Sequence, residues 1–158
     1  MKARLQVMKF GGTSVGDAVC IARTAQIIAK AAKENACVAV VSAMSGVTNR
    51  LIEAAKKAQA GDAREATAML DALRQQHETA LTSLVPREDK RARIRQQMEE
   101  VFAEGRRLCE GTALLRELTP RALDAISSLG ERLSAPLVAA AVSELGLQSK
   151  AKRSKRRN

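Results

Sequence analysis

A lysine, two glycines and two hydroxyl side chains follow one another in the segment VMKFGGTSVG. Glycines let backbone N–H groups approach an anion closely, and the start of the following helix favours negative charge. We therefore predict a phosphate-binding turn made of Gly11, Gly12, Thr13 and Ser14. Lys9 is predicted to be catalytic, neutralising charge on a phosphoryl group during transfer. The alternatives are a surface lysine at the end of an edge strand, an ordinary tight turn, and hydroxyls that only cap the next helix.

A second turn with the sequence SAMSGVTN follows a second apolar run. Its small residues leave room for a ligand, and its hydroxyls and backbone amides can bind a carboxylate or a phosphate. One exposed contact of this kind contributes roughly 0.3–1 kcal/mol, so a substrate needs several donors. We predict substrate contacts at Ser42, Ser45 and Thr48. The alternative is a capped strand-to-helix turn that binds nothing.

A carboxylate, Glu131, follows a glycine break between two helical patterns. In such a position it can receive the ammonium group of an amino-acid substrate, or it can form a solvated pair with a nearby arginine. The only histidine, His77, has leucines four residues before and after it and is interpreted as a helix-face residue. The methionines are interpreted as core residues, and no metal site is predicted.

Two strands are needed to hold these turns. Residues 4–10 and 37–41 have strand patterns, and the second run, CVAVV, is apolar throughout. A continuous apolar run is typical of a strand buried on both faces of a parallel sheet with helices on each side. Between the strands, apolar residues at helical spacing predict a helix capped by Asp17. Strand, helix and strand then form a βαβ unit.

The middle of the chain has a helical pattern throughout. Helices are predicted to begin near Thr48 or Asn49, after the capping residue Asp62, after the helix breaker Pro86, at Thr119-Pro120, and after Gly130. The total is two strands and five or six helices. Because both edges of a two-stranded parallel sheet need partners, the pattern indicates an incomplete domain.

Composition limits the class of protein. A chain of 158 residues suits one domain, its apolar share of 46% is ample for a core, and Phe10 and Phe102 are the only aromatic side chains. No apolar stretch reaches the roughly 18 residues of a membrane span, and no signal peptide is recognised. Three scattered cysteines match neither a disulfide framework nor a metal site. The predicted location is therefore the cytoplasm, without membrane association.

The net charge of +10 is concentrated at the end of the chain. Six of the basic residues lie within the last nine positions: Lys150, Lys152, Arg153, Lys155, Arg156 and Arg157. We predict a solvated, disordered tail at 150–158, with contact to nucleic acid or to an anionic surface as the alternative. The near absence of aromatic side chains for base stacking makes a nucleic-acid partner a weak alternative.

Four segments of the chain closely resemble aspartokinases, which belong to the amino-acid kinase superfamily. They are KFGGTSVG at 9–16, VSAMSGVTNRL at 41–51, ELTPRALD at 117–124 and GERLSAPLVAAA at 130–141. The similarity runs from about Val7 to Ala151, and KFGGTSV is specific within the superfamily. The resemblance implies transfer of a phosphoryl group from ATP, with Mg²⁺, to the side-chain carboxylate of L-aspartate, the first step toward lysine, threonine and methionine.

The same resemblance implies roles for individual residues. Lys9 matches the catalytic lysine, residues 11–14 match the phosphate loop, and Ser42, Thr48 and Glu131 match aspartate-contacting positions. The implied fold is α/β, a three-layer αβα sandwich with a mostly parallel sheet and a large helical segment. Homo-oligomerisation is left open.

The resemblance stops where the family continues into a further strand with an Asp-Ala-Arg-like signature. We expect residues 1–149 to form the N-terminal, acceptor-binding part of an amino-acid kinase domain, and 150–158 to form the tail. Most of the ATP site would then be missing from a partial sandwich. We therefore expect this chain alone to be inactive, and a non-catalytic aspartate-binding or interaction fragment is the alternative.

Overall fold

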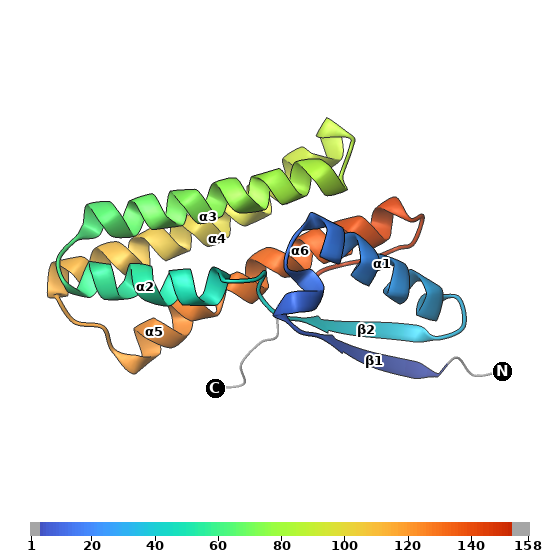
Figure 1. Cartoon of the computed structure of the whole chain (residues 1–158), viewed down its shortest axis with the longest axis horizontal. Coiled ribbons are helices and arrows are strands. Elements are labelled where there is room, and N and C mark those ends of the chain that lie inside the picture. The colour runs from blue at the N-terminus through green and yellow to red at the C-terminus, as the bar shows by residue number, and fades with distance from the viewer. Residues whose placement is uncertain (1–3, 153–158) are drawn as a thin grey trace.

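A small parallel sheet and a long helical bundle make up the fold. The computed structural model describes residues 4–152. The elements in chain order are β1 (Leu5–Phe10), the 3₁₀ helix η1 (Gly12–Val15), α1 (Ala18–Ala32), β2 (Ala36–Val41), α2 (Val47–Gln59), α3 (Ala63–Leu84), α4 (Glu88–Leu115), α5 (Pro120–Ser127) and α6 (Leu129–Glu144). In Figure 1, α1 and α6 lie against one side of the strands, and α2 to α5 extend away from the end of the sheet.

The sheet has only two strands in the described part of the chain. β1 and β2 are parallel, with Leu5 opposite Ala36 and Phe10 opposite Val41. Phe10 is buried beneath the helices, whereas Leu5 and Val7, on the opposite face, are 66% and 64% exposed. The predicted α/β class with a parallel sheet is confirmed, as a partial fold.

The expectation that the second strand is buried on both faces is wrong for the described residues. Val38 and Val40 of β2 are 47% and 49% exposed. They share a face with Leu5 and Val7, because paired residues of parallel strands point to the same side. The helices that pack on the sheet, α1 and α6, cover the other face. The apolar run of β2 is therefore correct for a strand but is covered on one side only.

Local caps explain where several helices begin. Asp17 accepts a hydrogen bond from the Cys20 backbone N–H at 2.8 Å, and this bond lowers the pKa of its carboxyl group. Asp62 caps α3 in the same way, and Thr119 caps α5 with Pro120 at the first helical position. These predicted helix starts are confirmed.

One predicted break is misplaced. The boundary between α5 and α6 falls at Ser128, so Gly130 lies inside α6 rather than between two helices. Glu131 consequently belongs to the first turn of α6. The glycine is used for close packing, as its contacts in the site show, and this requirement looks the same in the sequence as a helix break.

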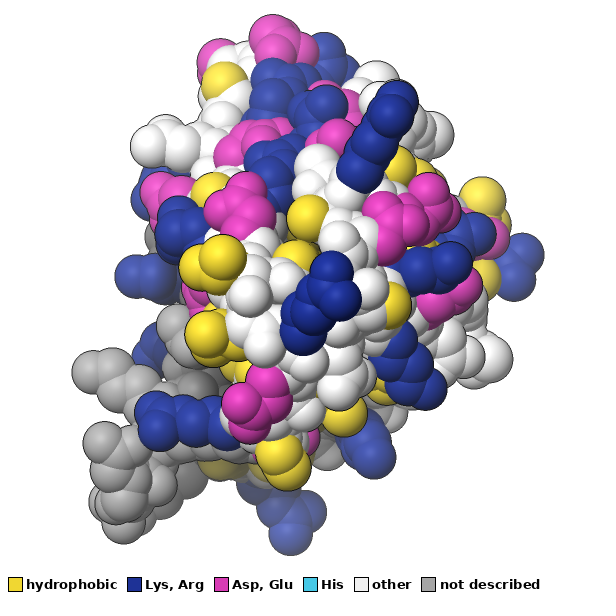
Figure 2. All heavy atoms as spheres, turned by 90° about the vertical axis from the view of Figure 1, so that its left-hand side faces the viewer, with side chains coloured by type: hydrophobic (Ala, Val, Ile, Leu, Met, Phe, Trp, Pro, Cys, Tyr) yellow, Lys and Arg dark blue, Asp and Glu magenta, His cyan; other side chains and the backbone are white. Residues whose placement is uncertain are grey.

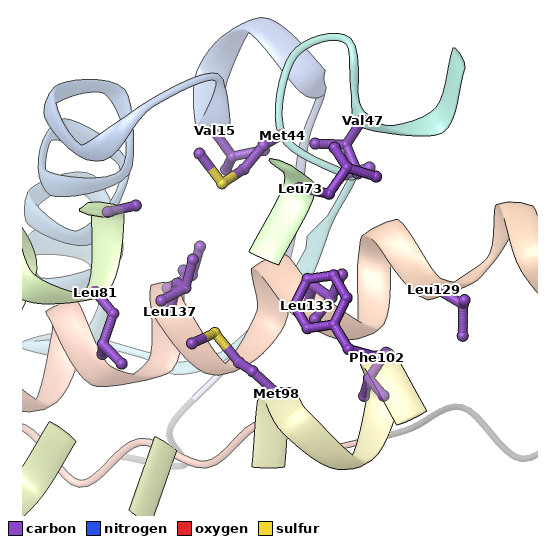
Figure 3. Packing of buried hydrophobic residues seen from close by; sticks show 14 of the residues in the cluster. Val15, Met44, Val47, Leu73, Leu81, Met98, Phe102, Leu129, Leu133 and Leu137 are labelled. Atoms are coloured by element: carbon purple, nitrogen blue, oxygen red, sulfur yellow. The ribbon is translucent and has the colours of Figure 1, made fainter. Parts of the chain in front are cut away.

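The core is aliphatic and centres on α6. Leu129, Leu133 and Leu137 are buried in one cluster with residues from every helix that surrounds α6. Figure 3 shows Val15 and Met44, which come from the two turns after the strands, packed above the α6 leucines. Both turns are therefore held in place by side chains that belong to the core.

His77 lies in this core on the inner face of α3, as predicted. Its Nδ1 donates to the backbone carbonyl of Leu73 at 2.7 Å, and its ring meets the ring of Phe102 edge to face at 5.8 Å. Its Nε2 has no hydrogen-bond partner. Burial lowers the pKa of His77, because a charged imidazolium would lose its hydration there.

The end of the helical bundle has a mixed surface. Figure 2 shows Lys and Arg side chains interspersed with Asp and Glu on this face, with hydrophobic side chains scattered between them.

No helix within residues 4–152 combines the length and the apolar composition required to cross a membrane. Of the predicted tail at 150–158, residues 150–152 are in neither helix nor strand, and the remainder lies outside the described residues.

Candidate functional site

A cleft of about 430 Å³ opens where β1 and β2 end. The carboxyl ends of parallel strands lie at one edge of a sheet, which is where α/β proteins commonly bind ligands. The cleft combines residues of both predicted turns with a carboxylate from a distant helix: Gly12, Thr13, Ser42, Ala43, Met44, Ser45, Gly46, Thr48, Asn49 and Glu131. The two turns therefore share one site.

The first turn is a single 3₁₀ turn between β1 and α1. The Ser14 backbone N–H donates to the carbonyl of Gly11 at 3.0 Å. The buried hydroxyl of Thr24 donates to the carbonyl of Ser14 at 2.6 Å. Val15 is fully buried and fixes the end of the turn in the core. Thr13 is left exposed at the cleft, while Asp17, not Thr13 or Ser14, caps the next helix.

The second turn connects β2 to α2 without a side-chain cap. Gly46 precedes the helix with a φ of 76°, a left-handed conformation that favours glycine. No side chain accepts from the first amides of α2, and Thr48 and Asn49 of that first turn line the cleft. The Val47 N–H donates to the Met44 carbonyl at 3.1 Å, and the N–H groups of the next residues at an uncapped helix start favour an anion such as a carboxylate or a phosphate.

The two turns are in direct contact with each other. The Ser45 hydroxyl donates to the carbonyl of Gly12 at 3.3 Å. A Cβ atom at Gly16 would lie 2.7 Å from the Ser45 Oγ atom, so only glycine fits there without a shift. The ladder between the strands also continues into the second turn, because the Ser42 N–H donates to the Phe10 carbonyl at 3.0 Å.

Glu131 reaches the cleft because α6 packs tightly on the second turn. A Cβ atom at Gly130 would lie 2.6 Å from the Cβ atom of Ala43. On the same helix, the buried Ser134 hydroxyl donates to the Ser42 carbonyl at 2.6 Å. Arg132 forms a two-pronged ion pair with Glu104 of α4, with N–O distances of 2.8 and 2.7 Å.

The structure brings most of the predicted site residues together, but not all of them. Gly12, Thr13, Ser42, Ser45, Thr48 and Glu131 all line the cleft. Gly11, Ser14 and Lys9 do not line it. Lys9 is exposed on β1, two residues before the turn, and its place in the strand alternation puts it on the uncovered face of the sheet. The predicted roles of all these residues stay predictions.

Sequence reasoning missed several residues that line or support the cleft. Met44 and Ala43 were not singled out, although they line it, and Ser134, Arg132 and Glu104 were missed altogether. The one available signal was a serine within the apolar stretch LSAPLV, three residues after Glu131 and hence on the same side of the helix.

The described residues provide no metal site. Within residues 4–152, no three or more His, Cys, Asp and Glu side chains come together in a way that could hold a metal ion. The cleft has one carboxylate and is otherwise lined by hydroxyl, amide, backbone and apolar groups. Such a lining suits a small ligand that carries both an anionic group and a cationic group.

This geometry defines an α/β domain with a cleft for a small ligand at the carboxyl ends of parallel strands. The chain belongs to the amino acid kinase family, whose family model matches residues 4–157. It is similar to aspartokinase 3, chloroplastic, of Arabidopsis thaliana, with 33% identity over 147 residues. It is also 31% identical over 150 residues to an aspartokinase of Candida albicans.

Solved structures agree with these similarities. E. coli aspartokinase III in complex with lysine and aspartate matches 92% of this chain with a TM-score of 0.76 and 32% identity. The same enzyme in complex with aspartate and ADP matches with a TM-score of 0.74.

These matches cover only part of each relative. This chain spans 24% of the Arabidopsis protein, 27% of the Candida protein and 30% of aspartokinase III.

Proposed function

We propose that this chain carries the acceptor-binding part of an aspartate kinase. The observation that carries the proposal is the shared cleft, in which two hydroxyl-lined turns face a single carboxylate. Its support from outside the chain is the similarity to aspartokinase III, which has been solved with aspartate and with ADP. The reaction is attack of the aspartate side-chain carboxylate on the γ-phosphorus of ATP, which forms 4-phospho-L-aspartate and releases ADP.

The cleft offers complementary groups for each end of L-aspartate. The hydroxyls of Ser42 and Thr48, with the uncapped amides of α2, can donate to carboxylate oxygens, and the Ser45 hydroxyl can do so by giving up its 3.3 Å bond to the Gly12 carbonyl. Glu131 can accept from the α-ammonium group. A ligand that has both groups is held from two sides, whereas a dicarboxylate without an amine contacts the turn only. This difference gives the proposal a sharp test.

The proposal also assigns a role in phosphoryl transfer to Lys9. Its ammonium group would neutralise charge on the transferring phosphoryl group, together with N–H groups of the turn that begins at Gly11. Lys9 is exposed on the uncovered face of the sheet, two residues before the first turn, and in this proposal its side chain extends from that face to a phosphate bound at the turn. The described residues offer no ligand set for Mg²⁺, so in this proposal Mg²⁺ arrives with the nucleotide and no step is assigned to it.

A second candidate is a non-catalytic aspartate-binding or interaction fragment. The uncovered apolar face around Val7, Val38 and Val40 favours it, because a sheet of this kind is normally packed on both sides. We expect negligible kinase activity from this chain alone, since phosphoryl transfer needs donors around the whole transferring group. The predicted cytoplasmic location and homo-oligomerisation stay predictions.

The test is an NMR titration of the 158-residue chain with L-aspartate, succinate and MgATP, followed by a coupled kinase assay. L-Aspartate should shift the amides of the Ser42–Thr48 turn and bind at least 10-fold more tightly than succinate. Glu131→Gln should remove this preference. The matched control is Glu117→Gln, which changes an exposed carboxylate outside the cleft.

Three outcomes separate the candidates. Binding of L-aspartate without MgATP binding or turnover supports the fragment that binds aspartate alone. Binding of both ligands with turnover supports a working kinase and contradicts our expectation of inactivity. No preference for L-aspartate over succinate, or an unchanged preference in Glu131→Gln, refutes the proposed recognition.

A further inference from the structure

The first turn of α6 is held to the rest of the protein at three points around Glu131. Gly130 packs on Ala43, the Arg132 guanidinium pairs with Glu104 of α4, and Ser134 reaches the end of β2. These contacts reach two different parts of the chain, the second turn at Ser42 and Ala43 and helix α4 at Glu104. They surround one residue that lines the cleft, whereas Glu131 itself is exposed to it.

The interior of α6 explains why this turn needs outside support. Pro136 lies inside the helix and has no N–H group. The carbonyl of Arg132 therefore receives no backbone hydrogen bond from the residue four positions on. The first turn is thus joined to the rest of its helix by one bond fewer than in a regular helix, and tertiary contacts must fix its position.

Ser134 makes the contact that bears most directly on the cleft. Its side chain is completely buried, and its hydroxyl lies 2.6 Å from the Ser42 carbonyl and 3.3 Å from the Glu131 carbonyl. One buried hydroxyl thus joins the backbones of two residues that both line the cleft and are far apart in sequence. A buried hydroxyl is costly without a partner, which favours this one arrangement.

We propose that Ser134 is a positioning residue: its hydroxyl, together with the Arg132–Glu104 pair, fixes Glu131 relative to the Ser42–Thr48 turn. The two sides of the cleft can then bind one amino acid at the same time. The identity of that ligand rests on the proposed function. The fixed geometry between α6 and the turn does not, and it can be measured without a ligand.

Backbone amide hydrogen exchange, followed by NMR, tests the fixed geometry. The reporters are the amides of Ser42 and Val47, which donate to the carbonyls of Phe10 and Met44. In Ser134→Ala their exchange should be at least 10-fold faster relative to the amides of α3. Dividing each exchange rate by the rate of the α3 amides cancels any loss of global stability, because such a loss accelerates exchange at all core amides together. The matched control is Ser143→Ala, because that hydroxyl bonds only to Ala139 of the same helix.

A second pair of variants keeps the test decisive if Ser134→Ala folds poorly. Arg132→Gln removes the ion pair to Glu104, and we expect the same local acceleration at Ser42 and Val47. Its control is Arg106→Gln, which removes the ion pair between α4 and Asp71 of α3. That pair lies outside the set of residues that line the cleft.

Ligand affinity gives a readout that a purely structural role would not move. Ser134→Ala should weaken L-aspartate at least fivefold and leave succinate unchanged, since only L-aspartate needs both sides of the cleft. The inference is overturned if the exchange ratio in Ser134→Ala equals that in Ser143→Ala, or if both ligands weaken equally. If the parent chain binds neither ligand, the proposed function fails, while the exchange ratio still decides whether Ser134 positions the turn.

Discussion

Two helical glycines, Gly130 and Gly111, should respond to alanine with opposite signs. At Gly111 in α4, an added Cβ atom meets nothing within 4 Å. At Gly130 in α6 it would lie 2.6 Å from the Cβ atom of Ala43 and 3.3 Å from a methyl group of Val47. Both substitutions raise helix propensity, so the difference between them isolates the close packing of α6 on the second turn.

The expected magnitudes follow from this geometry. Alanine is more favourable than glycine inside a helix by about 0.5–1 kcal/mol, which is the gain expected for Gly111→Ala. Carbon atoms in contact are normally about 3.5–4.0 Å apart, so the Gly130 variant has an overlap of roughly 1 Å. Because the Ala43 Cβ atom is fixed to the backbone, we take the upper part of the overpacking range, about 2–3 kcal/mol. The net loss expected for Gly130→Ala is therefore about 1–2.5 kcal/mol.

Urea unfolding of the two variants and the parent, followed by circular dichroism, measures this difference. The free energies of unfolding of the two variants should differ by about 2–3 kcal/mol, with the parent between them. A Gly130→Ala protein as stable as the parent would refute the reasoning. It would mean that α6 and the second turn are not in contact at Ala43, and the placement of Glu131 at the cleft would fail with it.

Two further predictions concern the core and the sheet. Because burial lowers the pKa of His77 in the folded state, only the unfolded chain takes up this proton just below pH 6.5. The free energy of unfolding should therefore fall as the pH drops below about 6.5, by at most about 1.4 kcal/mol per pH unit, and His77→Leu should remove this component. An equal loss between pH 7.5 and 5.5 in parent and variant would contradict it. On the exposed sheet face, Val7→Thr should change stability by less than about 0.5 kcal/mol, whereas Leu133→Ala should cost about 2–5 kcal/mol. Denaturant unfolding measures both, and a loss above 1 kcal/mol for Val7→Thr would show that this face is covered in solution.

Short-range features of the sequence predicted the starts of several helices correctly. The starts of α1, α3 and α5 follow from Asp17, Asp62 and Thr119, because a cap is made between a side chain and an amide a few residues away. The convergence of the two turns also follows from a simple rule, since parallel strands end at the same edge of a sheet. Both conclusions need no knowledge of distant contacts.

Features that depend on distant partners could not be predicted. The apolar run of β2 indicates a strand, but which of its faces is covered depends on elements elsewhere in the chain. Gly130 was expected to interrupt a helix, because a glycine selected for close approach to Ala43 looks the same in the sequence as one that breaks a helix. Ser134 has no local sign of its role, since its partner Ser42 precedes it by 92 residues.

The unpaired edges of the two-stranded sheet also affect self-association of the chain. Within the described residues, each strand pairs on one side only, so the other side presents a row of free backbone donors and acceptors. The segment Ala36–Val41 contains no charge, proline or glycine, which is the composition that supports intermolecular strand stacking. Crowded solutions of the isolated chain are therefore expected to nucleate fibrous aggregates from this segment.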